Sequence, residues 1–164
     1  MKIRNLLMFL FCIGIVLPSF AQTSDAEAEA IVNLLGVQKK EAISKLVSVS
    51  GKDSIAFWKL YDEYHQKNLA TGKQRLKLYE KTAEAYGNMT PATADSLSKQ
   101  YFDNRFGQEK SLEEYYKKIK AATNAMIAFE FYQAEVYLLT QIRAHIMQQI
   151  PTYGQFQAAV KKNR

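Results

Sequence analysis

Two histidines and several carboxylates are the side chains in this sequence whose types and spacing could do chemistry. Asp62 precedes His65 by three residues, and on a helix this spacing places both groups on one face. Di-iron four-helix bundles use a carboxylate-x-x-His pair twice, together with glutamates from other helices. Here the pair occurs once, and His145 has Gln141 and Gln149 as its helical neighbours. We interpret both histidines as structural and predict no metal site. A metal-binding protein centred on Asp62 and His65 remains an alternative.

Sequence motifs for other catalytic chemistry are missing. The chain has no G-x-S-x-G elbow, no H-E-x-x-H helix, no P-loop and no glycine-rich phosphate-binding loop. The carboxylate pairs Asp62-Glu63 and Glu113-Glu114 are adjacent in sequence, so on a helix they point about 100° apart and cannot face each other as an acid and a base. We therefore predict that the protein is not an enzyme, with no catalytic residues and no cofactor.

The first 21 residues have the order of parts of an export signal. Lys2 and Arg4 form a short basic region, and an apolar run over 6–17 leads to Ser19-Phe20-Ala21, a small-x-small cleavage site. The apolar run is shorter than the roughly 20 residues that a transmembrane helix needs. We expect residues 1–21 to be a cleaved signal peptide and the remaining chain to work outside the cytoplasm.

Removing this segment changes the composition. Cys12, the single cysteine of the chain, is lost, so the mature protein would have no disulfide and no thiolate ligand. Two basic residues and no acidic ones are removed, and the formal charge falls from +6 to +4. Lysines and acids are interspersed, whereas nucleic-acid binders cluster basic residues on one face. We expect no nucleic-acid partner.

Long segments with a 3.6-residue apolar period dominate the mature chain, which predicts an all-α protein. We expect one helix over 25–47 and a second from Ser50 to about residue 86. A third begins at Pro91, a break or kink falls near Thr123-Asn124, and a fourth helix then runs to Gln149. Polar residues mark their starts: Ser24 with Glu27, Ser50 with Asp53, Thr90 before Pro91, and Thr123. Pro151 ends the last of these helices.

The lengths and apolar faces of these segments predict their arrangement. A helix over 50–86 would be about 55 Å long, so we expect an elongated bundle or cradle of about four long helices. Residues 125–149 are apolar around more than half of the circumference, which predicts the most buried helix. We expect one domain over 22–151 and a loosely docked, flexible tail over 152–164.

Several stretches resemble the Spy/CpxP family of periplasmic stress proteins, which is marked by two L-T-x-x-Q motifs at helix starts. The first corresponds to Val49-Ser50-Gly51-Lys52-Asp53 and the second to Ala122-Thr123-Asn124-Ala125-Met126. Ser50 and Thr123 keep the capping hydroxyl, while the leucine and the glutamine are replaced in both. The stretches Phe57-Trp58-x-x-Tyr61-x-Glu63-Tyr64 and Phe131-Tyr132-Gln133-x-Glu135, and the closing Ile150-Pro151, complete a divergent likeness over about residues 25–151.

This resemblance implies a periplasmic, ATP-independent chaperone-like or envelope-stress protein that binds apolar segments of unfolded or partly folded proteins. It also implies that the protein forms a homodimer. The sequence holds ten tyrosines and nine phenylalanines, and aromatic side chains beside lysine stems suit a contact surface. The candidate client-binding residues are Trp58, Tyr61, Tyr79, Phe102, Phe106, Tyr116, Lys73 and Lys77. The alternative from another class is a regulatory module that docks on a membrane stress sensor or an anti-sigma system.

Overall fold

The computed structural model describes the backbone of residues 25–162 and the side chains of residues 35–162. Over this range every regular element is helical, which confirms the all-α prediction. The proposed signal peptide and the Ser24 cap lie outside the described residues. The elements are α2 (Asp25–Leu46), α3 (Gly51–Ala85), the 3₁₀ turn η1 (Tyr86–Asn88), α4 (Pro91–Ala122), α5 (Ala125–Gln149) and α6 (Tyr153–Lys162).

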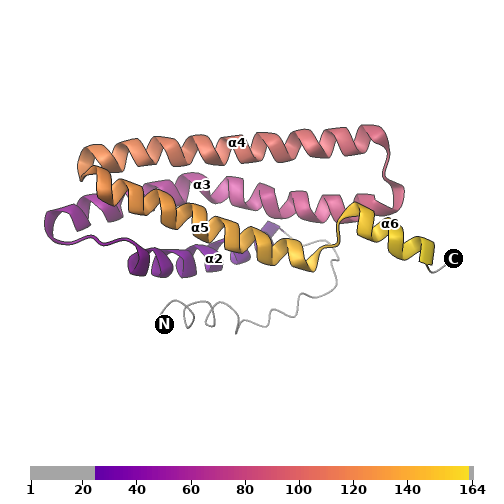
Figure 1. Ribbon diagram of the computed structural model, residues 1–164, viewed down its shortest axis with the longest axis horizontal. Coiled ribbons are helices and arrows are strands. Elements are labelled where there is room, and N and C mark those ends of the chain that lie inside the picture. Colours follow the sequence, from indigo (N-terminus) through magenta and orange to yellow (C-terminus); the bar gives the residue numbers. More distant parts are fainter. Residues whose placement is uncertain (1–24, 163–164) are drawn as a thin grey trace.

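Four of these helices form an elongated bundle (Figure 1). The long helices α3 and α4 run antiparallel as a hairpin, α5 returns along α4, and α2 packs against both α3 and α5. The 35 residues of α3 span about 52 Å at 1.5 Å per residue, which sets the length of the molecule.

The main core lies where all four helices meet. Rings from α3 and α5 stack edge to face at its centre, with the Tyr64 and Phe131 ring centroids 5.4 Å apart and those of Phe57 and Phe131 6.3 Å apart. Ile43 of α2 and Ile119 of α4 are fully buried beside them. Further along the hairpin, Leu78, Tyr79, Tyr86 and Leu97 are buried outside this core cluster.

The predicted N-cap residue stands at two of the three described helix starts, and its side chain makes the capping hydrogen bond at one of them. Thr90 caps α4, because its side chain accepts a hydrogen bond from the Thr93 amide, and Pro91 occupies the first turn. Ser50 is the N-cap residue of α3, but its side chain makes no capping hydrogen bond.

At the α4–α5 corner the residue expected to cap is not the one that does. Thr123 ends α4, and its hydroxyl donates to the Ile119 carbonyl oxygen at 2.7 Å. Asn124 caps α5 instead, with Oδ1 accepting from the amides of Met126 and Ile127 at 2.9 and 3.0 Å. Capping by Ser50 and Thr123 hydroxyls was therefore a wrong prediction.

The chain after Pro151 forms a helix where the sequence suggested a loosely docked tail. The Tyr86 hydroxyl donates to the Pro151 carbonyl oxygen at 2.8 Å, and the Tyr86 ring lies 5.6 Å from that of Tyr153 and 5.4 Å from that of Phe156. One buried tyrosine therefore holds the start of α6 at the α3–α4 end of the bundle.

Candidate functional site

A buried glutamate is the least expected feature of the core. Glu135 of α5 is fully buried, and its Oε2 accepts from Lys39 Nζ at 3.0 Å and from the Tyr64 hydroxyl at 2.9 Å. Its Oε1 and the buried Tyr61 hydroxyl have no hydrogen-bond partner. Burial, followed by the nearby Glu135 charge, raises the pKa of both Tyr61 and Tyr64 well above the ordinary value. Both tyrosines are thus neutral, and Tyr64 donates its hydroxyl hydrogen to the Glu135 carboxylate.

Charged residues of α2 form the outer side of this buried cluster. The Lys39 ammonium lies 5.3 Å from the Tyr64 ring centroid, and Lys40 donates to the Asp62 carboxylate at 2.5 Å. His65 is half-buried beside them, and its pKa is lowered first by burial and next by the Lys39 charge. These polar contacts join α2 to α3 and α5, which gives the cluster a role in positioning helices.

Trp58, Tyr61 and Tyr79, three of the predicted client-binding residues, belong to the interior or its edge. Tyr61 is fully buried and Tyr79 is 8% exposed, so neither presents a surface in this conformation. Trp58 is half-buried against Phe57, with Lys40 lying 5.6 Å from its ring centroid. On α3, Lys73 is half-buried and Lys77 is exposed, and neither lines the groove described below.

Of the predicted client-binding residues on α4, Phe102 and Phe106 are exposed, whereas Tyr116 is half-buried and packs against the core. Phe102 is 59% exposed and Phe106 is 66% exposed, and their rings stack with centroids 6.3 Å apart. With Glu109 and Glu113 between them and Tyr116, these residues follow steps of four and three along α4, so they share one face of the helix.

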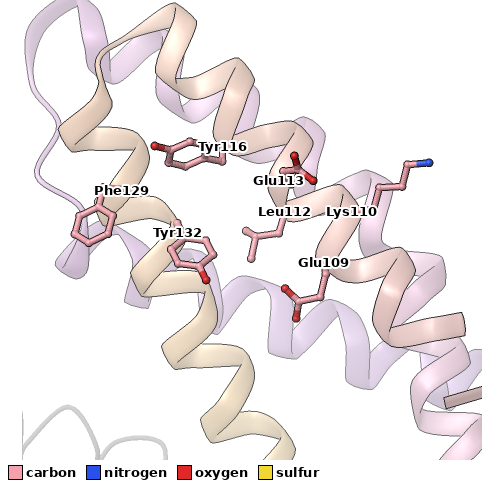
Figure 2. Close-up of a pocket in the computed structure, with 7 residues that line it drawn as sticks. All are labelled: Glu109, Lys110, Leu112, Glu113, Tyr116, Phe129 and Tyr132. Atoms are coloured by element: carbon pink, nitrogen blue, oxygen red, sulfur yellow. The ribbon is translucent and has the colours of Figure 1, made fainter. Parts of the chain in front are cut away.

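Tyr116 also lines a shallow groove between α4 and α5 (Figure 2). The groove has a volume of about 580 Å³ and is mostly apolar. Its wall on α5 consists of Phe129 and Tyr132, which are 46% and 42% exposed, and the Tyr116 and Tyr132 rings meet edge to face at 6.5 Å. We call this set the aromatic groove: Glu109, Lys110, Leu112, Glu113, Tyr116, Phe129 and Tyr132.

α5 has more buried residues than α3 or α4, as predicted, but it also exposes a second apolar face. Ile127, Phe131 and Leu138 face the core, whereas Phe129, Tyr132 and Val136 are exposed. The sequence signal for the α5 half of the groove was present, since these three residues form a second apolar stripe. It was attributed to burial because a helix that is apolar all round is most often enclosed.

Neither a metal site nor a membrane-spanning helix is found in the described part of the chain. Over these residues no three histidine, cysteine, aspartate or glutamate side chains gather as metal ligands. Among the helices of residues 25–162, none has both the length and the apolar character that crossing a bilayer requires. In comparisons with known proteins, the chain matches no family model, no curated protein and no solved structure.

Proposed function

We propose that this protein binds exposed apolar segments of other proteins along the outer face of α4 and α5, as an ATP-independent chaperone-like protein outside the cytoplasm. The observation that carries the proposal is the exposed aromatic surface of these two helices. Phe102, Phe106, Phe129 and Tyr132 each leave two fifths or more of their side chain accessible to solvent. Exposed aromatic side chains gathered on one side of a helical bundle favour a site for another protein.

The shape of the surface suits an elongated occupant. The α4 stripe runs from Phe102 to Tyr116, and the α5 stripe runs from Phe129 to Val136 beside it. Two such ridges with a groove between them can receive an apolar helix or an extended segment, because side chains of the occupant reach successive positions on both helices. Rigid helices hold the surface ready, which limits the entropy lost on binding.

Light scattering of an unfolding model protein tests the proposal, with the mature protein added at stoichiometric amounts and without ATP. We expect suppression that rises with the concentration of the protein. The double variants Phe102→Ser/Phe106→Ser and Phe129→Ser/Tyr132→Ser should lose at least about half of it, since these rings supply exposed apolar area and little core packing.

A matched control uses apolar side chains that are equally exposed but lie elsewhere. Val37 of α2 is 70% exposed and Ile55 of α3 is 78% exposed, and neither lines the groove. Val37→Ser/Ile55→Ser should suppress aggregation like the wild type. Equal loss in all three variants would show that total surface hydrophobicity matters and the groove does not. No suppression by a folded, helical wild type would favour a regulatory module with one dedicated partner.

A further inference from the structure

The aromatic groove carries a carboxylate that makes no hydrogen bond or ion pair with another described residue. This carboxylate belongs to Glu109 of α4, which lines the groove and is exposed. Figure 2 shows its carboxylate and the Leu112 side chain directed toward Tyr132 of α5. The negative charge therefore lies inside the apolar surface, where an occupant would cover it.

Two basic residues near this carboxylate are engaged or directed elsewhere, and a third, Arg105, lies one turn earlier on α4 without an ion pair to Glu109 among the described residues. Arg143 of α5 is half-buried and donates a hydrogen bond to the Gln108 side chain. Lys110 extends away from Tyr132 in Figure 2, toward the outer side of α4. Neither one forms an ion pair with Glu109 within the described residues, although the Glu109 charge partly opposes the lowering of the Arg143 pKa by burial.

A second carboxylate stands one turn further along the same edge. Glu113 lines the groove too, and it is paired with Lys117 of its own helix. Both members of that pair are exposed, and such surface pairs are weak enough to exchange partners when another cation arrives. The tyrosine rings of Tyr116 and Tyr132 add negative ring faces that attract a cation.

We propose that the groove selects apolar segments that contain a basic residue, with the lysine or arginine of the segment placed at Glu109 and its apolar neighbours on Leu112, Tyr116, Phe129 and Tyr132. Covering Glu109 with a purely apolar or acidic segment would remove the carboxylate from water without a partner, which is unfavourable. A basic side chain supplies the missing charge and can lay its methylene stem on the rings. The inference rests on the proposed function and adds the chemical class of its clients.

The test uses three labelled peptides with the same apolar sequence and a central lysine, glutamine or glutamate. Fluorescence anisotropy measures the affinity of each for the mature protein at low salt. We expect the lysine peptide to bind about fivefold tighter than the glutamate peptide, with glutamine between them, as one partly covered charge pair would give. The difference should shrink in high salt.

Two variants test whether Glu109 causes the preference for the lysine peptide. Glu109→Gln should reduce the difference between lysine and glutamate peptides to less than about twofold, and the glutamine peptide should bind at least as tightly as it binds the wild type, because the charge that it would leave unpaired is removed. Asp103→Asn removes another exposed carboxylate of α4 that does not line the groove, and it should keep the wild-type order. Circular dichroism checks that both variants remain folded.

The possible results separate the inference from the proposed function. Equal affinity for the three peptides, or tighter binding of the glutamate peptide, would overturn the charge selection and leave binding of apolar segments intact. A preference that survives Glu109→Gln would place the selecting charge elsewhere and would also overturn the inference. If none of the three peptides binds the folded protein, the proposed function fails, and the selection fails with it.

Discussion

The imidazole of His65 lies directly against the backbone of α2 at Gly36. A Cβ atom at position 36 would stand 2.3 Å from Cε1 and 2.6 Å from Nε2 of His65, which is closer than any real contact. Gly36 is buried, and the absence of its side chain is what lets α2 approach α3 at this point. Gly36 is therefore a packing residue.

Replacing Gly36 with alanine should change the free energy of unfolding in opposite directions in two backgrounds. Gly36→Ala should lower the free energy of unfolding by about 1 kcal/mol, because displacing the histidine ring costs more than the gain in helix propensity. In a His65→Ala background the same change should raise stability by up to about 1 kcal/mol, since the collision is gone and alanine favours the helix. Urea unfolding of the four proteins completes the cycle. The same sign in both backgrounds would refute the contact.

The buried pair Lys39–Glu135 makes a second prediction. Lys39→Met leaves the fully buried Glu135 carboxylate with the Tyr64 hydroxyl as its donor, and should cost about 3 kcal/mol of unfolding free energy. Lys39→Met/Glu135→Leu should lie within about 1 kcal/mol of the wild type, because no uncompensated charge remains.

An exposed pair on the same helix is the control for this experiment. Lys45 and Glu41 form an i,i+4 pair with side chains that are 51% and 66% exposed. Lys45→Met should change the unfolding free energy by less than about 0.5 kcal/mol. Equal losses for Lys39→Met and Lys45→Met in denaturant melts would show that burial of Glu135 does not govern stability.

Stability should depend on pH through His65. Burial, then the charge of Lys39, lowers the folded-state pKa of this imidazole, whereas Asp62 and Glu135 partly oppose the shift and Lys40 adds to it. The unfolded chain therefore takes up the proton first, at a pKa of about 6.5. The contribution of neutral His65 to the free energy of unfolding is therefore complete above pH 6.5. It is lost as the pH falls from 6.5 through the lowered pKa of the folded state.

Glu114 titrates in a separate, more acidic window. Hydrogen bonds from Lys118 and Lys67 lower the pKa of Glu114 to about 2. Any contribution of this carboxylate to the stability of the fold is therefore lost only when the pH falls below the ordinary glutamate pKa near 4.5. Melting temperatures measured between pH 7.5 and 5 should fall for the wild type and stay nearly level for His65→Gln. A slope that is unchanged by His65→Gln would assign the pH dependence to another group.

Two cap residues of similar chemistry should differ in their effect on stability. Asn124→Ala removes a side chain that accepts from two amides of α5 and should cost about 1 kcal/mol. Ser50→Ala removes a hydroxyl that makes no capping hydrogen bond, and should cost at most a few tenths of a kcal/mol. Thermal or urea melts decide the order. A larger loss for Ser50→Ala would contradict the capping arrangement seen at both helix starts.

The fold could be predicted from sequence because long helices have a simple apolar period and clear stop signals. Gly51–Ala85 and Ala125–Gln149 begin or end within one or two residues of the expected positions. The cap of α5 was harder to predict, since Thr123 and Asn124 are adjacent and both can cap. Backbone geometry, with Asn124 extended and Thr123 not, decides between them.

The groove and the buried glutamate depend on how α5 is rotated, which a single helical pattern does not fix. Two apolar stripes follow α5, one through Phe131 and the other through Tyr132, and either could have faced the core. With Phe131 inward, Glu135 one turn later must also point inward, and Tyr132 remains outside. Lys39 and Tyr64 donate hydrogen bonds to the Glu135 carboxylate and so allow it to be buried, but they belong to helices that are distant from α5 in sequence.

The half-buried tryptophan at the junction of α2 and α3 gives the molecule an optical reporter of its own. Trp58 is the single tryptophan of the chain, and it lies edge-on to Phe57 and Tyr61 with the Lys40 ammonium 5.6 Å from its ring centroid. Separation of α2 from the bundle would expose the indole to water and remove the cation, which should shift its emission to longer wavelength. Occupants of the α4–α5 groove would leave that emission unchanged, so docking of α2 and binding at the groove can be followed as separate signals.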